Sequence, residues 1–488
     1  MLALFMTGCG GEPTLTPTES PTAVAQNSRT KPSKPPATAK PKTTNPTLHE
    51  FRDEQLDDSA GPPAPVVDSA NEPTRTNSAA RPPAVDEDRV AAHGIRKLTG
   101  EHLTLYTDLP ADDEIDRLPA IFDQAYPQWC EYFKRPDLAD DAWRVRGCLM
   151  NDAAKFRAAG LLPDDLPPFK YGYARGAELW LHEQPTAYYR RHLLLHEATH
   201  ALMQMAFGTC GPPWYMEGIA ELLGTHSLVD GRLTLGVFPA SAEDVPEWGR
   251  IRMVREAVAA GRALSVDDIL AYPDDAHLQN EPYGWCWALA AFLDGHRRYR
   301  ARFRQLPGEL SADDFNTRVR AMFADDWREL NEEWQVFVHE LDFGYDLVRG
   351  AIDFKAGVPL NGRKTVSVRA DRGWQSSGVR LEAGKTYALT ATGRYQVADR
   401  PRPWWCEPGG VTIRYVRGRP LGMLLAGVLP DVPEAEAAHG LLSPVAVGLQ
   451  ATVTPQSAGT LYLRINDSMA ELADNSGTLQ VVVEAQGE

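Results

Sequence analysis

The sequence predicts a multidomain protein in which an α+β domain is followed by an all-β sandwich. The chain has 488 residues, more than one ordinary domain contains. Residues 11 to about 88 are rich in Pro, Thr, Ser and Ala. Apolar residues then recur mainly at helical spacing up to about residue 343, and short alternating segments follow residue 355. The expected boundaries are a signal remnant over 1–9, a linker over 10–92, and domains over 93–347 and 355–488.

The composition argues against some classes of protein and of binding partner. The formal net charge is −16, which argues against a nucleic-acid partner because phosphate binding needs a basic face. The hydrophobic fraction of 43% and the charged fraction of 24% are typical of a globular protein. No apolar run reaches the ~18 residues that a membrane-spanning helix needs.

The first nine residues form a short apolar run that ends in Thr7-Gly8-Cys9. This run resembles the lipobox of bacterial lipoproteins. The resemblance implies lipidation of Cys9 and an extracytoplasmic, membrane-anchored or secreted location. Residues 10–92 contain few aromatic residues and are expected to be a disordered tether, or a tail without a role. A flexible chain of ~80 residues reaches on the order of 50 Å.

The α+β domain is expected to begin with strands and end with helices. Strands are predicted over 98–106, 143–149 and 171–181, with a helix over 111–132. Asp230-Gly231 between apolar residues predicts a β-hairpin over 228–233. The other predicted helices are 188–207, a helix from Trp214 onward, 245–260, 266–271, 282–298, 311–323 and 326–343.

The helix over 188–207 contains an H-E-x-x-H motif, His196-Glu197-Ala198-Thr199-His200. Residues i and i+4 of a helix lie on one face, so His196 and His200 can present imidazole nitrogens to one zinc ion. Glu197 would then lie beside the open coordination position. The alternative is a helix whose histidines only satisfy local hydrogen bonds. His192, one turn earlier, either supports the site, faces the substrate or is solvated.

A catalytic zinc site needs a third protein ligand. In one class of zinc peptidases this ligand is a His in H-E-x-x-H-x-x-G-x-x-H, but Met203 and Ala206 occupy those two positions here. The remaining common solution is a Glu on a following helix. We assign Glu217 as the ligand and Glu221, on the same helix face, as a hydrogen-bond partner of a ligating histidine. His226 is a weaker rival for the third position.

The segment from Trp214 to Glu221, W-x-x-E-G-x-A-E, resembles the gluzincin (peptidase MA-like) metallopeptidases. The resemblance covers about residues 95–345 and implies a thermolysin-like fold, a peptide or protein substrate, and zinc held by His196, His200 and Glu217. It implies Glu197 as general base and Tyr283 as an oxyanion-stabilising residue. The alternative for Tyr283 is a core aromatic residue at a helix start.

The family resemblance also bears on the kind of cleavage. It implies that the strand over 171–181 is the edge strand that pairs with an extended substrate backbone. Exopeptidase relatives carry a Glu motif near this point, and Gly176-Ala177-Glu178-Leu179 resembles it only faintly. We therefore expect an endopeptidase rather than an aminopeptidase.

After residue 355 short alternating segments separated by Gly-rich breaks predict an all-β sandwich. The stretch from Leu461 to Asp467, with Asp474-Asn475-Ser476-Gly477, resembles the LecA-like (PA-IL) galactose-binding lectins over about 365–485. The resemblance implies calcium bound by the side chains of Asp467, Asp474 and Asn475 and a bound galactose-type glycan. Glu471 matches a position that uses its backbone carbonyl. The predicted strands are 365–370, 378–381, 386–390, 411–415, 460–465 and 479–484.

Two alternatives remain open for this domain and two for the whole chain. The Asp/Asn loop is also typical of Asx turns without metal, and Trp404-Trp405 is expected to fill the core rather than stack on a sugar. The chain could be a carbohydrate-binding surface protein with an inactive peptidase-like domain, or a structural protein in which zinc only stabilises the fold.

Besides Cys9 there are five cysteines, whose pairing the sequence does not determine.

Overall fold

The computed structural model describes residues 82–139, 143–274, 281–432 and 440–486. All of them belong to one compact unit of the chain, Arg75–Glu488. Cys9 and the predicted tether up to residue 81 lie outside the described residues. The first described helix, α1 (Glu87–Ala92), falls within the predicted linker, and its Val90 is buried in a core cluster. Folded structure is therefore present a few residues before the expected boundary at residue 93.

A five-stranded sheet, in the order β1-β2-β3-β5-β4, opens the folded part. Strands β2, β3 and β5 are parallel, whereas β1 and β4 pair antiparallel at the two edges. Two single strands of the prediction are hairpins instead, because turns at residues 100–102 and 176–177 interrupt them. The strands are β1 (Arg96–Thr99), β2 (Leu103–Thr107), β3 (Val145–Met150), β4 (Gly172–Arg175) and β5 (Glu178–His182).

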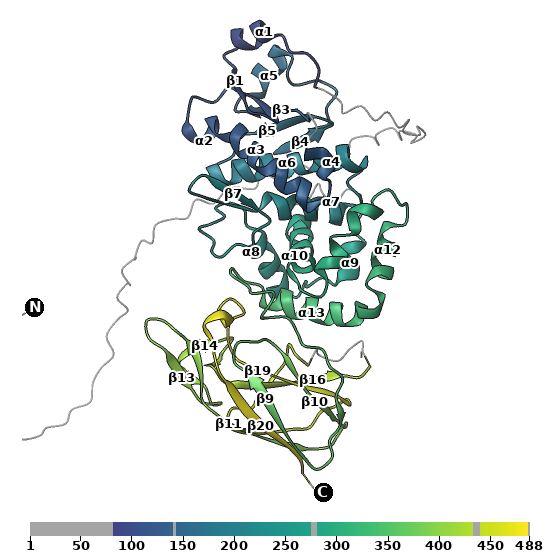
Figure 1. Cartoon of the computed structure of the whole chain (residues 1–488), viewed down its shortest axis with the longest axis vertical. Helices are drawn as coiled ribbons and strands as arrows, with labels where there is room; N and C mark the ends of the chain where they lie inside the picture. The colour runs from purple at the N-terminus through teal and green to yellow at the C-terminus, as the bar shows by residue number, and fades with distance from the viewer. Residues whose placement is uncertain (1–81, 140–142, 275–280, 433–439, 487–488) are drawn as a thin grey trace, which may run out of the picture. The chain divides into compact units, whose positions relative to one another are not determined.

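Alternation along the strands gives this sheet two buried faces. Leu105 and Leu181 face the larger core, to which α3 (Leu118–Tyr132) and α6 (Ala187–Phe207) contribute. Tyr106 and Trp180, one residue along each strand, face a smaller core formed with α1 and α5 (Ala153–Ala159). Figure 1 shows α5 and α1 on one side of the sheet and α3 and α6 on the other. The sheet thus holds α6 firmly along one face.

A helical part follows the sheet (Figure 1). The predicted hairpin is confirmed as β6 (His226–Val229) and β7 (Arg232–Leu235), with Asp230 and Gly231 both at positive φ. Helix α8 begins at Arg250 rather than at residue 245, because Gly249 adopts a left-handed conformation before it. The sequence did not predict the short helices α4 (Pro136–Ala139), α5 and α11 (Arg300–Phe303). The other helices are α2 (Asp113–Asp116), α7 (Pro213–Gly224), α8 (Arg250–Ala259), α9 (Val266–Leu270), α10 (Glu281–Gly295), α12 (Phe315–Met322) and α13 (Trp327–Glu340).

The C-terminal part is all-β, as predicted, with two main sheets of order β17-β16-β19-β10-β8 and β18-β11-β20-β9. Their facing side chains form a separate core cluster. Two small two-stranded sheets, β12-β13 and β14-β15, lie outside them. The strands are β8 (Val358–Pro359), β9 (Arg363–Arg369), β10 (Gln375–Leu381), β11 (Tyr387–Thr392), β12 (Tyr395–Ala398), β13 (Trp404–Cys406), β14 (Val411–Val416), β15 (Arg419–Leu421), β16 (Leu424–Pro430), β17 (Val445–Ala446), β18 (Gln450–Val453), β19 (Gly459–Ile465) and β20 (Thr478–Ala485).

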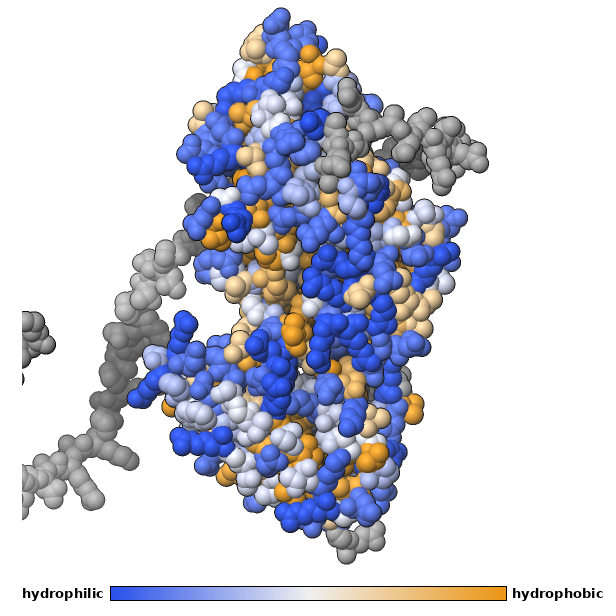
Figure 2. Space-filling view, viewed as in Figure 1, coloured by the Kyte–Doolittle hydropathy of each residue, from blue (hydrophilic) through white to orange (hydrophobic). Residues whose placement is uncertain are grey.

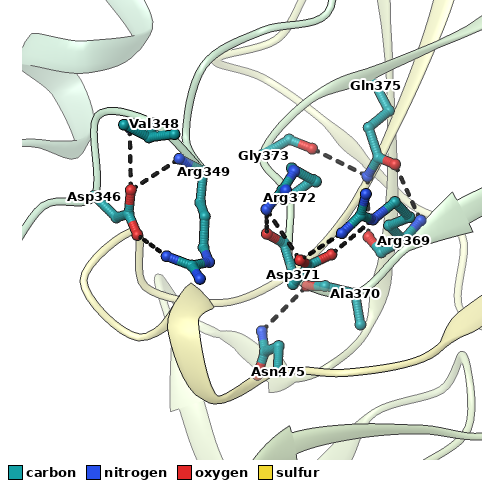
Figure 3. Close-up of polar contacts among 10 residues, drawn as sticks. All are labelled: Asp346, Val348, Arg349, Arg369, Ala370, Asp371, Arg372, Gly373, Gln375 and Asn475. Carbon is teal, nitrogen blue, oxygen red and sulfur yellow. Dashed lines mark hydrogen bonds and ion pairs between the residues drawn. The ribbon is translucent and has the colours of Figure 1, made fainter. Parts of the chain in front are cut away.

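Buried polar contacts join the β-sheets to the helical part. Arg464 of β19 donates from both terminal nitrogens to the carboxylate of Glu340 on α13, at 2.7 Å each, and both side chains are buried. Met469, after β19, belongs to the core cluster of the helices. Figure 3 shows that Arg369 and Arg372 hold Asp371 at the β9–β10 turn.

The surface is ordinary for a globular chain. The face seen in Figure 2 is mainly hydrophilic, with apolar residues scattered over it. Within the described ranges, no helix combines the length and apolar character that crossing a bilayer requires. The described cysteines are all free thiols, namely Cys130, Cys148, Cys210, Cys286 and Cys406.

Candidate metal centre

The H-E-x-x-H motif lies in the middle of α6, as the sequence predicted. The Thr186 side chain accepts a hydrogen bond from Tyr189 N and caps the start of the helix, and Gly208 ends it with φ 76°. Leu194, Ala198 and Leu202 pack into the core. That packing fixes the rotation of α6 and turns the opposite face, with both histidines, toward α7.

Three side-chain atoms from these two helices converge on one point. Nε2 of His196 and Nε2 of His200 are 3.1 Å apart. Oε2 of Glu217 lies 3.2 Å from the first nitrogen and 3.6 Å from the second. His196 and Glu217 are buried, and His200 is partly buried. The structure thus brings together the three residues that the sequence singled out as metal ligands.

The dimensions of this triangle fit a small tetrahedral cation. Ligands bound to zinc at about 2.0–2.1 Å in a tetrahedron are about 3.3–3.4 Å apart. The three measured separations bracket that value. Glu217 Oε2 is buried, yet it accepts no well-aligned hydrogen bond from the described residues. The donor set and its spacing therefore suit zinc, and the carboxylate oxygen is left available to an ion.

The charges within the triangle favour an ionised Glu217. Burial disfavours its charged form, but His200 and His196 outweigh that effect and lower the pKa of Glu217 to about 2. Burial likewise opposes the charged form of His196, but the Glu217 and Glu221 carboxylates beside it raise its pKa to about 9. A cation bound between these groups would therefore displace protons from the histidines.

Glu221 supports the triangle from behind, as predicted. Its Oε1 lies 3.4 Å from Nδ1 of His196. The carboxylate also accepts hydrogen bonds from Nε and Nη2 of Arg250, at 3.0 and 2.8 Å, and from Nε1 of Trp248 at 3.2 Å. These contacts fix both Glu221 and the orientation of the His196 ring.

His192 is buried against the same carboxylate, with its Nε2 at 3.3 Å from Glu221 Oε2. The possibility that it is solvated is therefore wrong. His192, His196 and Glu221 form a second group with suitable metal-ligand atoms. Since the Arg250 guanidinium already neutralises Glu221, this second group serves as support for the triangle rather than as a separate cation site.

A cleft runs past the triangle in two halves, with volumes of about 440 and 570 Å³. Both halves are lined by Gly172, Tyr173, His196, Glu197 and Tyr283. Glu197 is buried, and burial raises the pKa of its carboxyl group. Tyr283, at the start of α10, has its ring centre 6.1 Å from that of His196. The predicted base and the predicted oxyanion residue therefore lie in the wall of one cleft.

Part of the predicted edge strand and two other predicted residues, Glu178 and His226, lie elsewhere. The edge strand along the cleft is β4, whereas residues 178–181 belong to β5 inside the sheet. Glu178 pairs with the buried side chain of Arg146 and does not line the cleft. His226 stacks on Tyr188, with its Nδ1 2.8 Å from Gly224 O, and belongs to neither group of metal-ligand atoms.

In the β-sandwich, Asp467 and Asn475 are in contact. Nδ2 of Asn475 donates to Oδ2 of Asp467 at 2.8 Å and to Ala370 O at 3.2 Å, the latter drawn in Figure 3. Oδ1 of Asn475 and Oδ1 of Asp474 are buried without a hydrogen-bond donor among the described residues. Glu471 binds Arg414 through its side chain.

Trp405 is 47% exposed, so the expectation that it fills the core is wrong.

Arg250 and Gly172 are among the residues of the centre that were missed from the sequence. Arg250 carries no local signal, because its importance comes from a contact with Glu221, 29 residues earlier in the chain. Gly172 did carry one, since an isolated glycine within a strand pattern suggests close approach of another group. It lies at the start of β4, against Glu197.

Comparison with known proteins adds little. No family model matches the chain, and no curated protein matches it. One solved structure that it is similar to is a PllA-like lectin, the N-terminal domain of EclA, with 21% identity over 25% of this chain and 95% of that chain, at a TM-score of 0.19. Another is PliG of Aeromonas hydrophila, a periplasmic inhibitor of g-type lysozyme, with 12% identity over 28% and 97%, at 0.16. At these TM-scores neither match establishes a shared fold.

Proposed function

We propose that this chain is a zinc-dependent endopeptidase of the gluzincin type, held outside the cytoplasm by a lipid on Cys9. The observation that carries the proposal is the triangle of His196 Nε2, His200 Nε2 and Glu217 Oε2, with separations of 3.1, 3.2 and 3.6 Å. A buried carboxylate, Glu197, lies beside it in a cleft large enough for a peptide.

The residues around the triangle have separate tasks in peptide hydrolysis. Zinc, when bound, supplies a Lewis acid that acidifies water and polarises the scissile carbonyl. Glu197 accepts the proton of the attacking water and then delivers it to the leaving amine nitrogen as the C–N bond breaks. The Tyr283 hydroxyl donates a hydrogen bond to the carbonyl oxygen as negative charge develops on it. Glu221 holds His196 in the required orientation.

The cleft favours cleavage within a chain over removal of terminal residues. Its two halves extend from the same central residues, so a substrate can continue on both sides of the cleaved bond. The acidic side chain that would hold a free amino terminus, Glu178, is occupied by Arg146. Strand β4 is an edge strand, so its backbone groups are available to pair with an extended peptide.

The direct test is Glu197→Gln in the full-length protein, with labelled casein and a quenched peptide library as probes. The amide has the shape of the carboxylate but cannot accept the water proton, so cleavage should fall by about 10²–10⁴-fold while zinc content stays unchanged. Glu183→Gln, at a partly exposed ion pair with Arg190, is the matched control and should retain the wild-type rate. Wild-type cleavage by Glu197→Gln would refute the assignment.

The location is tested separately by fractionation. Cys9→Ser should move the protein from the membrane to the soluble fraction of an expressing bacterium. An unchanged distribution would contradict the lipid anchor.

A second candidate function, calcium-dependent binding of a galactose-type glycan, is supported by the unsatisfied buried oxygens of Asp474 and Asn475 near Asp467. Oxygen ligands clustered in one loop suit calcium. Calorimetric titration with calcium should give a signal that Asp474→Asn weakens. Asp371→Asn, whose carboxylate is held by arginines, should leave that signal unchanged. Absence of calcium-dependent retention on galactose-agarose would reject the glycan.

A further inference from the structure

The edge strand β4 passes unusually close to Glu197. A side-chain carbon placed on Gly172 would lie 2.6 Å from Oε1 of Glu197, 2.8 Å from its Cγ and 2.9 Å from its Cδ. Carbon atoms do not approach neighbouring atoms so closely without displacing them. Any residue other than glycine at position 172 would therefore displace either the strand or the carboxylate.

Lack of space for a side chain, rather than an unusual backbone conformation, explains why position 172 is a glycine. Gly172 does not have the positive φ that marks glycines such as Gly176 in the following turn. It pairs in regular register with Leu181 of β5, so an alanine would fit the strand itself. The nearest obstacle is Glu197, because all three nearest atoms belong to that side chain.

We propose that Gly172 is a positioning residue for Glu197. Its missing side chain lets the edge strand lie against the carboxylate and fixes the distance of that carboxylate from the His196–His200–Glu217 triangle. The contact is a property of the fold alone, whereas its role in catalysis rests on the proposed peptidase function.

The contact between Gly172 and Glu197 lies where the substrate would bind. Gly172 lines both halves of the cleft, and it belongs to the strand whose free edge would pair with the substrate backbone. Strand β4, which would align the substrate peptide, therefore also sets the position of the Glu197 carboxylate. A displacement of about 1 Å between reacting groups can cost on the order of 10²-fold in rate.

The contact is tested without any reference to activity, by a double-mutant cycle in the metal-free, full-length protein. Gly172→Ala should lower the unfolding temperature on the order of 5 °C in the wild-type background. In the Glu197→Ala background, where the three nearest atoms are gone, its effect should be much smaller. Gly308→Ala is the matched control, since no atom lies within 4 Å of the added carbon. Equal effects of Gly172→Ala in both backgrounds would refute the contact.

The role in catalysis is tested by kinetics on the casein and peptide probes. Gly172→Ala should lower kcat on the order of 10²-fold, with KM and zinc stoichiometry close to wild type, whereas Gly308→Ala should change none of the three. An unchanged kcat would overturn the positioning role. If wild-type protein cleaves neither probe, the proposed function fails and the positioning role fails with it, while the cycle still decides whether the contact exists.

Discussion

Removal of the Glu221 carboxylate should weaken both the fold and the metal centre. In Glu221→Ala, Arg250 loses two charge-assisted hydrogen bonds and Trp248 loses one. The Glu221 side chain is 1% exposed and that of Arg250 is 10% exposed, so the guanidinium would be left buried without a counter-charge. Loss of one partner of a buried ion pair costs about 3–5 kcal/mol. At roughly 2–4 °C per kcal/mol, the unfolding temperature should fall on the order of 10 °C.

The same substitution removes the carboxylate that faces His196 Nδ1. Loss of such a partner weakens metal binding by about 10–100-fold. Calorimetry of the metal-free protein would measure the first effect, and competition with a chromophoric chelator would measure zinc affinity.

The matched control is Glu183→Ala, at the start of the same helical region. The side chains of Arg190 and Glu183 are 13% and 23% exposed, so water can partly replace the lost carboxylate and the destabilisation should be smaller than in Glu221→Ala. This pair does not belong to the triangle. Glu221→Ala and Glu183→Ala with the same stability and the same zinc affinity would refute the supporting role of Glu221.

Three further predictions concern the Tyr283 hydroxyl, removal of the metal and the titration of Asp467. Tyr283→Phe should lower kcat by about 10²–10³-fold at unchanged zinc content, and an unaltered kcat would exclude the hydroxyl from catalysis. Removal of metal with 1,10-phenanthroline should abolish cleavage, and added zinc should restore it; persistent cleavage in the metal-free protein would contradict a metallopeptidase. Burial raises the pKa of Asp467 from 3.8 to about 7, so the folded sandwich binds this proton more tightly than the unfolded chain does. Its free energy of unfolding in calcium-free buffer should therefore fall as the pH rises from about 4 to about 7, and Asp467→Asn should remove that slope; the same slope in both proteins would contradict it.

The sequence predicted the local parts of the candidate centre well, because their geometry depends on helix periodicity. His196 and His200 lie one helical turn apart on α6, as do Glu217 and Glu221 on α7. Packing of Leu194 with its neighbours then determines the direction in which the two histidines face. Their convergence follows from two adjacent helices. Arg250 and Trp248 could not be predicted in this way, since only tertiary folding brings the start of α8 and the residues before it to Glu221, 27 to 29 residues earlier in the chain.

The sheets were predicted less accurately, for identifiable reasons. The run over 171–181 alternates well enough to suggest one strand, and the turn at Gly176 divides it into β4 and β5. The first part of the run, β4, is the edge strand, as predicted, but the prediction extended that edge to residues 178–181, which are inside the sheet. Strand β16 was missed because Leu424–Pro430 is a continuous apolar run without alternation, which is typical of a strand covered on both faces.

Zinc content of the full-length protein tests the central claim most directly, with wild type compared with Glu217→Gln and His226→Gln. The three-residue centre predicts about one zinc per wild-type chain, an equal content in His226→Gln, and a lost or much weakened zinc in Glu217→Gln. Absence of zinc from wild-type protein prepared in excess zinc, or full retention of zinc by Glu217→Gln, would contradict the proposed metal centre.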